Sequence, residues 1–364
     1  MQHEITHAAP LLDEYGHLKE AGYAKTLLPI YDRSAIKAPG WRIKEWDYYY
    51  IGNDRYGVAL TIADNSYMGL DSISLLDFQT PRQHTASPMS FFTGGKVGFP
   101  STSSKGDVFH SGKNHALYFR NDGKNRTLEF SMKNFYKGKS IEGSIELTDP
   151  HGESMVIATP FSEKPDHFYF NQKINCMPAK GSVFFDGVEY RFEPEDSFGV
   201  LDWGRGVWTY KNTWYWGSAS GLADNIPFGF NIGYGFGDTS AASENMLFYN
   251  HKAHKLTDVT FHIPMKPKKY KTKGGCCSQS GITVNTADMI EDYLAPWKFT
   301  SSDGRFEMDF EPIIDRHADS NVGLIRSNQH QVFGRFSGIA VLDDGTEIRI
   351  RDFMGFAEKV YNKW

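Results

Sequence analysis

Strict alternation between apolar positions and polar or glycine positions is the feature that most constrains this chain. In Phe228–Phe236, large apolar side chains occupy every second position, with glycines and Asn231 between them. In Ser140–Thr148, apolar residues or glycine alternate with serine, threonine and glutamate. Because successive side chains of a strand point to opposite faces, such segments have one apolar and one polar face. This pattern is typical of antiparallel strands wrapped around a core.

The same alternation recurs along the chain, from Trp41–Gly52 to Thr346–Ile350, with turns such as Asp186-Gly187 between segments. It predicts roughly fourteen to sixteen short strands and almost no long helix. A length of 364 residues favours two domains. We therefore predict an all-β fold of two tandem antiparallel β-barrels or curved sandwiches, covering residues 1–195 and 196–364.

Three segments depart from this pattern. Residues 81–114 are rich in proline, glycine, serine and threonine and predict a long loop. Lys266–Lys273 contains five lysines, which favours a solvated loop, with an anion-binding lid as the alternative. Asp352–Trp364 has apolar residues at helical spacing after a plausible N-cap aspartate, which predicts a short C-terminal helix.

Composition narrows the class of protein. Hydrophobic residues make up 40% and charged residues 23%, which is typical of a soluble globular protein. The net charge of −5 argues against a nucleic-acid-binding surface. No apolar run approaches the ~18 residues of a membrane span, and the N-terminus has no signal-peptide pattern. Cys176 and the adjacent Cys276 and Cys277 form no disulfide framework. A cytoplasmic protein is expected, and the oligomeric state is left open.

The stretch Ser197–Gly221 is the strongest candidate for a site. It contains one acid, Asp202, one arginine, Arg205, and half of the tryptophans of the chain, Trp203, Trp208, Trp214 and Trp216. Apolar rings beside a few fixed polar groups are typical of a small-molecule site. The alternative is a core tryptophan cluster beside a salt bridge. In the first interpretation, Arg205 keeps Asp202 ionised as a base or an orienting group.

Further carboxylates and polar side chains extend the candidate site. Glu45 and Asp47 share one face of a predicted strand, and Glu244 follows the glycine-rich strand. If Glu45 and Asp47 face inward, burial and mutual repulsion raise one pKa and provide a proton donor. The catalytic candidates are therefore Asp202, Arg205, Glu45, Asp47 and Glu244.

A polar stripe on the segment 165–173 provides the remaining candidates. His167, Tyr169, Asn171 and Lys173 share one strand face, which lines either a wet cavity or the solvent side of an edge strand. Asn231 is the one polar side chain on a glycine-lined face. Hydrolase, nucleotide-binding and zinc motifs are absent, so no metal site or cofactor is predicted.

Several motifs together resemble one known family. These are Arg42–Tyr49 (RIKEWDYY), Leu201–Gly206 (LDWGRG), Val332–Gly338 (VFGRFSG) and Gly355–Lys359 (GFAEK), with a terminal Trp364. The chain resembles the domain-of-unknown-function 2804 family from about Glu4 to its end. This family is distantly similar to the AttH and hydroxyneurosporene-synthase proteins. That similarity implies two lipocalin-like barrels and relatives that include carotenoid hydratases, cyclases and pericyclases. It transfers no catalytic residue.

These observations lead to one main hypothesis and two alternatives. The main one is a protein that binds an apolar or amphiphilic small molecule and acts on it by acid–base chemistry, as a hydratase, isomerase or cyclase. Aromatic rings would then stabilise a cation-like transition state. The alternatives are a non-catalytic carrier or sensor and a carbohydrate-active enzyme with paired carboxylates. A closed apolar cavity favours the first two, and an open cleft with coplanar rings favours the third.

Overall fold

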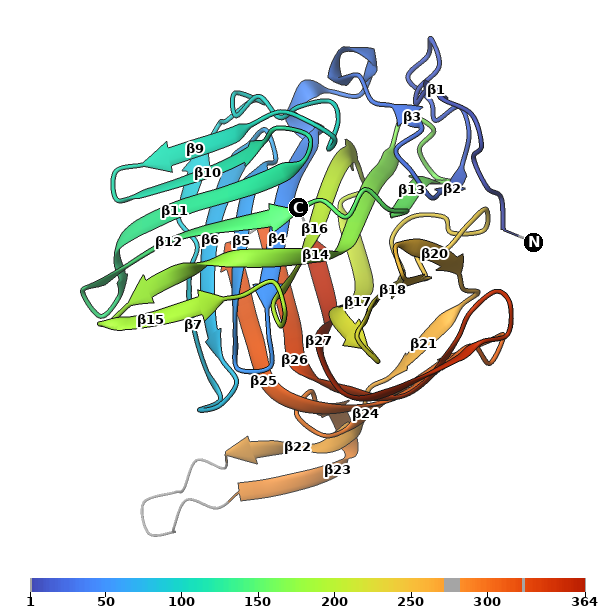
Figure 1. The fold of residues 1–364 in the computed structure, drawn as a ribbon. Helices are drawn as coiled ribbons and strands as arrows, with labels where there is room; N and C mark the ends of the chain where they lie inside the picture. Colours follow the sequence, from blue (N-terminus) through green and yellow to red (C-terminus); the bar gives the residue numbers. More distant parts are fainter. Residues whose placement is uncertain (1, 272–281, 323–324, 364) are drawn as a thin grey trace.

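The computed structural model describes residues 2–271, 282–322 and 325–363, and nearly all of it is β-sheet (Figure 1). Strands account for 63% of residues and helix for 2%, which confirms the predicted all-β class. Within the described residues, the first sheet contains β2 (Gly22–Ala24), β4 (Lys44–Gly52), β5 (Tyr56–Asp64), β6 (Met68–Asp77), β7 (Arg82–Ala86), β8 (Met89–Phe91), β9 (Val108–Gly112), β10 (His115–Asn121), β11 (Asn125–Tyr136), β12 (Lys139–Thr148), β13 (Met155–Pro160), β14 (Phe168–Phe185), β15 (Val188–Phe192) and β16 (Phe198–Val207).

The second sheet is built from the remainder of the chain. Its strands are β17 (Lys211–Ala223), β18 (Ile226–Tyr234), β19 (Met246–Tyr249), β20 (Lys252–Lys255), β21 (Val259–His262), β24 (Trp297–Ser301), β25 (Phe306–Val322), β26 (Ile325–Val341) and β27 (Glu347–Lys363). Their spatial order is β20-β19-β18-β17-β27-β26-β25-β24-β21. Among the described residues, neighbouring strands of both sheets run antiparallel, as the alternation predicts.

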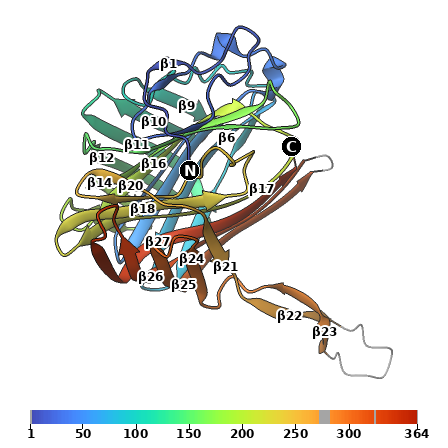
Figure 2. The ribbon, with the colours of Figure 1, turned by 90° about the vertical axis from the view of Figure 1, so that its right-hand side faces the viewer.

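Small elements complete the fold. A parallel pair is formed by β1 (Ala9–Pro10) and β3 (Pro29–Ile30), and single 3-10 turns span η1 (Arg33–Ala35) and η2 (Gly40–Arg42). The hairpin of β22 (Met265–Lys271) and β23 (Ile282–Glu291) projects from the body of the molecule (Figure 2). No described helix is long and apolar enough to span a membrane.

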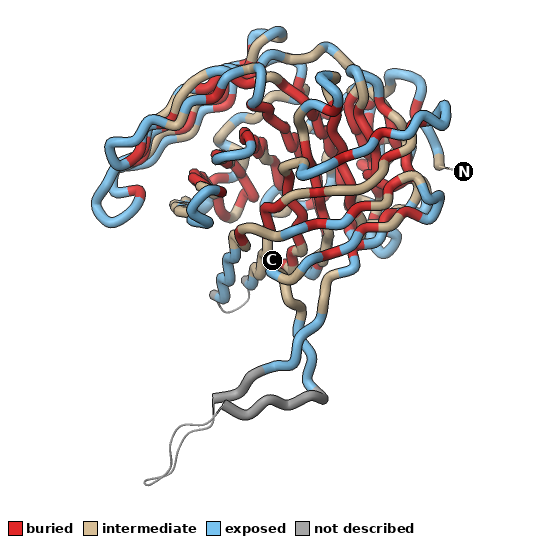
Figure 3. Tube along the Cα trace, turned by 60° about the horizontal axis from the view of Figure 1, so that its bottom comes forward, coloured by how far each residue is buried: buried red, intermediate tan, exposed pale blue. Residues whose placement is uncertain are grey.

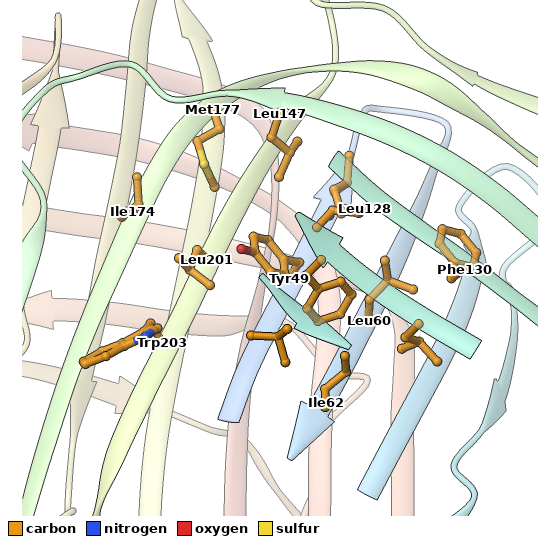
Figure 4. Packing of buried hydrophobic residues seen from close by; sticks show 14 of the residues in the cluster. Tyr49, Leu60, Ile62, Leu128, Phe130, Leu147, Ile174, Met177, Leu201 and Trp203 are labelled. Carbon is orange, nitrogen blue, oxygen red and sulfur yellow. The ribbon is translucent and has the colours of Figure 1, made fainter. Parts of the chain in front are cut away.

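Each sheet curls around its own core. The first sheet is ordered β7-β6-β5-β4-β16-β14-β12-β11-β10-β9. Side chains from its two ends, such as Leu60 on β5 and Leu128 on β11, belong to one buried cluster (Figure 4). Alternation in β11 and β12 supplies this core, because every second residue points inward. A second cluster, rich in phenylalanine and containing Phe230, Phe299 and Phe336, fills the other sheet. These curled sheets confirm the lipocalin-like architecture.

Strand β14 shapes the first sheet because it changes partners along its length. Its first part pairs with β13 and β16, and its last part pairs with β12 and β15. The register with β16 shifts between Ile174 and Met177, where Cys176 has a positive φ of 59°. Such a bulge bends a strand, so β14 can follow the curved sheet. Buried Cys176 is a free thiol.

Two predictions about elements are wrong. The helix predicted for Asp352–Trp364 is absent from the described residues, because residues 352–363 belong to strand β27. That strand pairs with β17 on one side and β26 on the other. Tertiary strand pairing therefore overrides a helical spacing of four apolar residues. Residues 81–114 are not one loop, since they contain β7, β8 and β9.

The structure also bears on the expected domain boundary and on the lysine-rich segment. Strand β16 belongs to the first sheet and β17 to the second, so the chain changes sheets between Val207 and Lys211. Independent domains divided at residue 195 stay a prediction. Lys266–Lys271 forms β22 and not a loop, whereas Lys273, Cys276 and Cys277 lie outside the described residues.

Buried residues also fill the space between the two sheets (Figure 3). One cluster there combines Tyr48 and Tyr50 of β4 with Trp216, Phe333 and Phe356 of the second sheet. Figure 1 shows β25 and β26 beside the strands β4–β6. The outer faces of the two curled sheets are thus packed against one another, and this junction contains the cavity described next.

Candidate functional site

A cavity of about 500 Å³ lies between the two sheets and not inside either curled sheet. Strands β4–β7, β14 and β16 form one wall, and β17 and β25–β27 form the other. Polar side chains such as Gln83, Gln329 and Asn362 line it together with aromatic side chains, namely Trp46, Tyr48, Tyr169, Trp208, Trp214, Tyr215, Trp216 and Phe236. The acidic and basic residues of the lining are Lys173, Asp202, Glu244, Arg316 and Glu358. This combination of apolar area and few charges suits an amphiphilic small molecule.

Strand alternation and one glycine build the aromatic wall. Trp214 and Trp216 point into the cavity from β17, and Trp46 does so from β4. An added Cβ on Gly204 would lie 1.9 Å from Cζ2 of Trp46, so only glycine leaves room for this indole. The missing side chain at Gly204 therefore makes room for a tryptophan ring. Trp46 meets Trp208 edge-to-face, with ring centroids 5.4 Å apart.

The side chains of Lys173 and Asp202 form an ion pair in the cavity lining. Lys173 on β14 and Asp202 on β16 are direct register partners. Lys173 Nζ lies 2.7 Å from Asp202 Oδ1, which also accepts a 2.6 Å hydrogen bond from Asn171 Nδ2. The ammonium group of Lys173 lies 4.1 Å from the ring centroid of Trp216, a cation–π contact. Asp202 is thus held as the charged partner of a buried lysine.

Two further carboxyl groups face the same cavity. Glu244 is buried, and loss of hydration raises its pKa to about 6, against the attraction of Lys173. Its carboxyl group lies over Gly233 of β18, where a Cβ would be in ordinary van der Waals contact at 3.7 Å. Burial likewise raises the pKa of Glu358. Glu358 accepts hydrogen bonds from Trp214 Nε1 at 3.0 Å and from Gln331 Nε2 at 3.1 Å.

This arrangement places a proton donor and a proton acceptor around one apolar space. A carboxyl with a pKa of about 6 is protonated in an appreciable fraction of molecules near neutral pH. Asp202, paired with Lys173, is a carboxylate and accepts protons. The surrounding rings stabilise positive charge with their π faces. The cavity is therefore equipped for proton transfer to and from a largely apolar molecule.

Four of the predicted site residues face the opposite side of the first sheet. Arg205, Trp203, Glu45 and Asp47 point into the core of the first sheet or its edge, and none lines the cavity. Arg205 Nη1 lies 3.0 Å from Asp47 Oδ1 and does not pair with Asp202. Residues three apart on a strand point to opposite faces, so the expected Asp202–Arg205 partnership is wrong. Burial raises the pKa of Asp47 as expected, but in a structural cluster.

The other predicted residues take different positions. Trp208, Trp214, Trp216, Tyr169 and Glu244 line the cavity together with Asp202. Asn171 and Asn231 lie behind the lining. Asn231 Oδ1 accepts a 2.7 Å hydrogen bond from Trp216 Nε1, and its Nδ2 donates to the Glu244 carbonyl at 2.9 Å. His167 is buried outside the lining, and its desolvation lowers its pKa.

Sequence analysis missed Trp46, Lys173 and Glu358 as site residues. Lys173 was present in the polar stripe on the same strand face as Tyr169 and Asn171. Trp46 shares a strand face with Tyr48, but nothing in the sequence shows that this face meets the second sheet. Glu358 was assigned to a helix, which hid its position beside Trp214. Strand periodicity identifies shared faces within a strand and not the neighbour across the cavity.

Comparisons with known proteins agree with this architecture. A family model described as a domain of unknown function (DUF2804) matches residues 2–364. The fold is similar to that of a putative AttH from Nitrosomonas europaea, with a TM-score of 0.52 and 11% identity, covering 96% of this chain and 98% of that chain. Kievitone hydratase from Nectria haematococca is similar with a TM-score of 0.47 and 12% identity, covering 98% of each chain. No curated protein sequence matches this chain. Identity this low relates folds and not activities.

Proposed function

This chain belongs to the DUF2804 family, and we propose that it binds an amphiphilic small molecule between its two sheets and transforms it by proton transfer. The observation that carries the proposal is the group of three buried carboxyl groups, Asp202, Glu244 and Glu358, beside Lys173 in one aromatic-walled cavity. The lining also contains Arg316, so acidic and basic groups share this cavity. Buried ion pairs contribute little net stability, so a purely structural role is a poor explanation. Hydration, double-bond migration and cyclisation all fit this arrangement.

For hydration of an alkene, Glu244 is the proposed proton donor. Its carboxyl proton passes to one alkene carbon, which forms a C–H bond and leaves a carbocation facing the indole rings of Trp214 and Trp216. Water attacks the cation and gives its proton to the Asp202 carboxylate. Transfer of that proton from Asp202 back to the Glu244 carboxylate restores both groups. In isomerisation or cyclisation, Asp202 removes a proton from the cation and no water is added.

Packing of the rings favours this function over carbohydrate cleavage. Trp214 and Phe236 meet at 77°, and Tyr48 and Trp216 meet at 76°. Trp46 and Tyr169 are nearly parallel, at 11°, but the other ring contacts of the lining are edge-to-face. Edge-to-face contacts enclose a ligand between rings, whereas sugar binding uses flat rings exposed side by side. A carrier of the same ligand would use the same enclosure without the proton transfer, and the experiments below separate the two.

Binding is tested with the fluorophore 1-anilinonaphthalene-8-sulfonate. We expect the wild-type protein to bind it with enhanced probe emission and quenched tryptophan emission. Trp214→Ala should weaken binding by about 5- to 150-fold, since removing an aromatic anchor costs about 1–3 kcal/mol. Trp41→Ala is the control, because Trp41 is 58% exposed and outside the cavity lining. Equal affinity of the two variants would contradict a ligand site between the sheets.

Catalysis is tested on a panel of amphiphilic alkenes and polyenes incubated in ¹⁸O-labelled water. Product analysis by mass spectrometry detects added water, and incubation in D₂O detects isomerisation through C–D bonds. Glu244→Gln and Asp202→Asn should each lower the rate by about 10²- to 10⁴-fold, the contribution of a general acid or base. Glu142→Gln on the exposed side of β12 is the control. Binding without turnover of any panel member favours the carrier.

A further inference from the structure

Asp71, His110 and His115 form a polar cluster away from the cavity. Asp71 Oδ2 lies 2.5 Å from His110 Nδ1 and 2.7 Å from His115 Nε2. Asp71 is not in the cavity lining, whereas its neighbours Leu70 and Ser72 on β6 are, so the cluster lies on the other face of that strand. We propose that these three side chains bind a divalent transition-metal ion, with Zn²⁺ as the representative.

The ligands come from strands at the two opposite edges of the first sheet, which the curl of the sheet brings together. Asp71 is on β6, His110 on β9 and His115 on β10. In the β9–β10 hairpin, His110 pairs with Leu117 and His115 pairs with Gly112, which places both imidazoles on the same face as the core residue Leu117. Strand positions of this kind hold ligands more rigidly than loops do.

Donor type and spacing both fit a metal ion. The donor atoms of the three side chains all lie within 4.8 Å of one another. Around a tetrahedral zinc ion with bonds of about 2.1 Å, ligand atoms are about 3.4 Å apart. Small side-chain rotations therefore bring the observed cluster to coordination distance. Two imidazoles and one carboxylate are a common donor set for Zn²⁺ and Fe²⁺, and water completes the coordination.

Charge balance is the second argument. The Asp71 side chain is 3% exposed, yet it has no lysine or arginine partner among the residues that the structure describes. Its Oδ1 atom is buried and lacks a hydrogen-bond partner within the same residues. Burying a carboxylate is costly unless a cation or several donors compensate its charge. A divalent ion held by Asp71 and the two imidazoles supplies that compensation.

Access and ligand support complete the site. The His110 side chain is 26% exposed and the His115 side chain 10% exposed, so an ion and its water ligands can enter from the His110 side. A Cβ on Gly112 would lie 2.4 Å from Cε1 of His115. Glycine at this position therefore lets the imidazole lie flat against the neighbouring strand and directs it toward Asp71.

The test is a titration of chelator-treated full-length protein with Zn²⁺ by calorimetry and with Co²⁺ by visible absorption. We expect one ion per chain, a Co²⁺ spectrum of nitrogen and oxygen ligation, and a higher Tm with Zn²⁺. His110→Ala and His115→Ala should each weaken Zn²⁺ binding by more than about tenfold. His84→Ala is the control, because His84 lies on β7 and stacks on Tyr136 away from the cluster.

Two results would overturn the proposal. One is a wild-type protein that takes up no Zn²⁺ and shows no change in Tm. The other is an equal loss of affinity in His84→Ala and His110→Ala, which would mean scattered surface binding. Because His110 is partly exposed, its variant is expected to fold, and circular dichroism checks this. Asp71→Asn then tests whether the carboxylate is a metal ligand. It should abolish the Co²⁺ spectrum, although both histidines are still present.

Discussion

Strands β4, β14 and β16 carry two buried ionic clusters, one on each face, and these differ in how completely their charges are satisfied. The closed cluster, on the core face, contains Arg205, Asp47, Glu45 and Arg33. The open cluster, on the cavity face, contains Lys173, Asp202 and the nearby Glu244. The two clusters share strand β16, and their carboxyl groups are similarly buried. Their comparison therefore shows how the surroundings of a buried carboxyl group set its role.

In the closed cluster, nearly every charge has a partner. Arg205 is fully buried, and its guanidinium donates to Asp47 and to the carbonyls of Trp46, Gly204 and Pro100. The ring of Trp203 lies 4.1 Å below it. Arg33 and Tyr31 both donate to Glu45. These contacts tie β4, β16 and the segment around Pro100 together, which is a structural role.

In the open cluster, Lys173 pairs with Asp202, and both side chains line the cavity together with Glu244. Burial raises the pKa of Glu244 from 4.5 to about 6, against the attraction of Lys173. Burial thus raises the pKa of one carboxyl group on each face, Asp47 and Glu244. Asp47 is bound by Arg205 inside a packed core, whereas Glu244 faces the cavity. Access to the cavity, and not burial alone, separates a structural cluster from a reactive one.

The largest expected change in the free energy of unfolding follows from replacing Arg205. Arg205→Met leaves Asp47 and Glu45 buried without their guanidinium partner, which should lower the free energy of unfolding by about 3–5 kcal/mol. Urea denaturation measures the change. Arg191→Met is the control, because the exposed Arg191–Glu189 pair should contribute only about 0–1 kcal/mol.

A small loss in Arg205→Met would break the comparison. If its stability matched that of Arg191→Met, the closed cluster would not be structural, and the two faces would no longer differ in role. A stable Arg205→Met variant with reduced 1-anilinonaphthalene-8-sulfonate binding would even reverse the assignment.

Much of the fold was predictable because side-chain alternation is a local property. Phe228–Phe236 and Ser140–Thr148 correspond closely to β18 and β12. The helix predicted at the C-terminus failed because Phe353, Phe356 and Val360 satisfy both a helical spacing and an extended strand. Pairing with β17 and β26 decided between the two, and the partners on β17 lie more than a hundred positions away in the chain.

The site was predictable only in part. Trp214 and Trp216, two of the predicted tryptophans, line the cavity. Period two alone separates Asp202 from Arg205, because residues three apart on a strand point to opposite faces. The meeting of Asp202, Glu244 and Glu358 was beyond local patterns. It depends on how the outer faces of the two curled sheets pack against one another, and the buried clusters between the sheets determine that packing. The Asp71 cluster was missed for the same reason, since its members lie 39 and 44 positions apart.

On the cavity face, Glu244→Gln is expected to raise the free energy of unfolding at high pH, by less than Arg205→Met lowers it. The pKa of Glu244 is raised from 4.5 to about 6 in the fold, so the native state binds a proton more tightly than the unfolded state. Its contribution is therefore favourable below pH 4.5 and is lost as the pH rises through 6, a difference of about 2 kcal/mol. Glu244→Gln does not titrate. It should be more stable than wild type by up to that amount at pH 8 and equal to it near pH 4.

Denaturation curves at pH 4, 6 and 8 check this prediction. Glu142→Gln is the control, because Glu142 is exposed on β12 and no comparable pH effect is expected. A Glu244→Gln variant less stable than wild type at pH 8 would show that the carboxylate is stabilised in the fold, as in the closed cluster.

The smallest expected effect on stability belongs to Asp202→Asn, although Asp202 is buried like Arg205. The amide oxygen can still accept from Lys173 Nζ, which keeps its cation–π contact with Trp216 and remains near Glu244. Replacing a charged hydrogen bond by a neutral one costs about 1 kcal/mol, well below the loss predicted for Arg205→Met. Urea denaturation at pH 7 measures it, with Asp196→Asn on the exposed Arg55 pair as the control. A loss of about 3–5 kcal/mol would mean that Lys173 depends on Asp202 as Asp47 depends on Arg205. Both faces would then be structural, and the proposed proton transfer would lose its base.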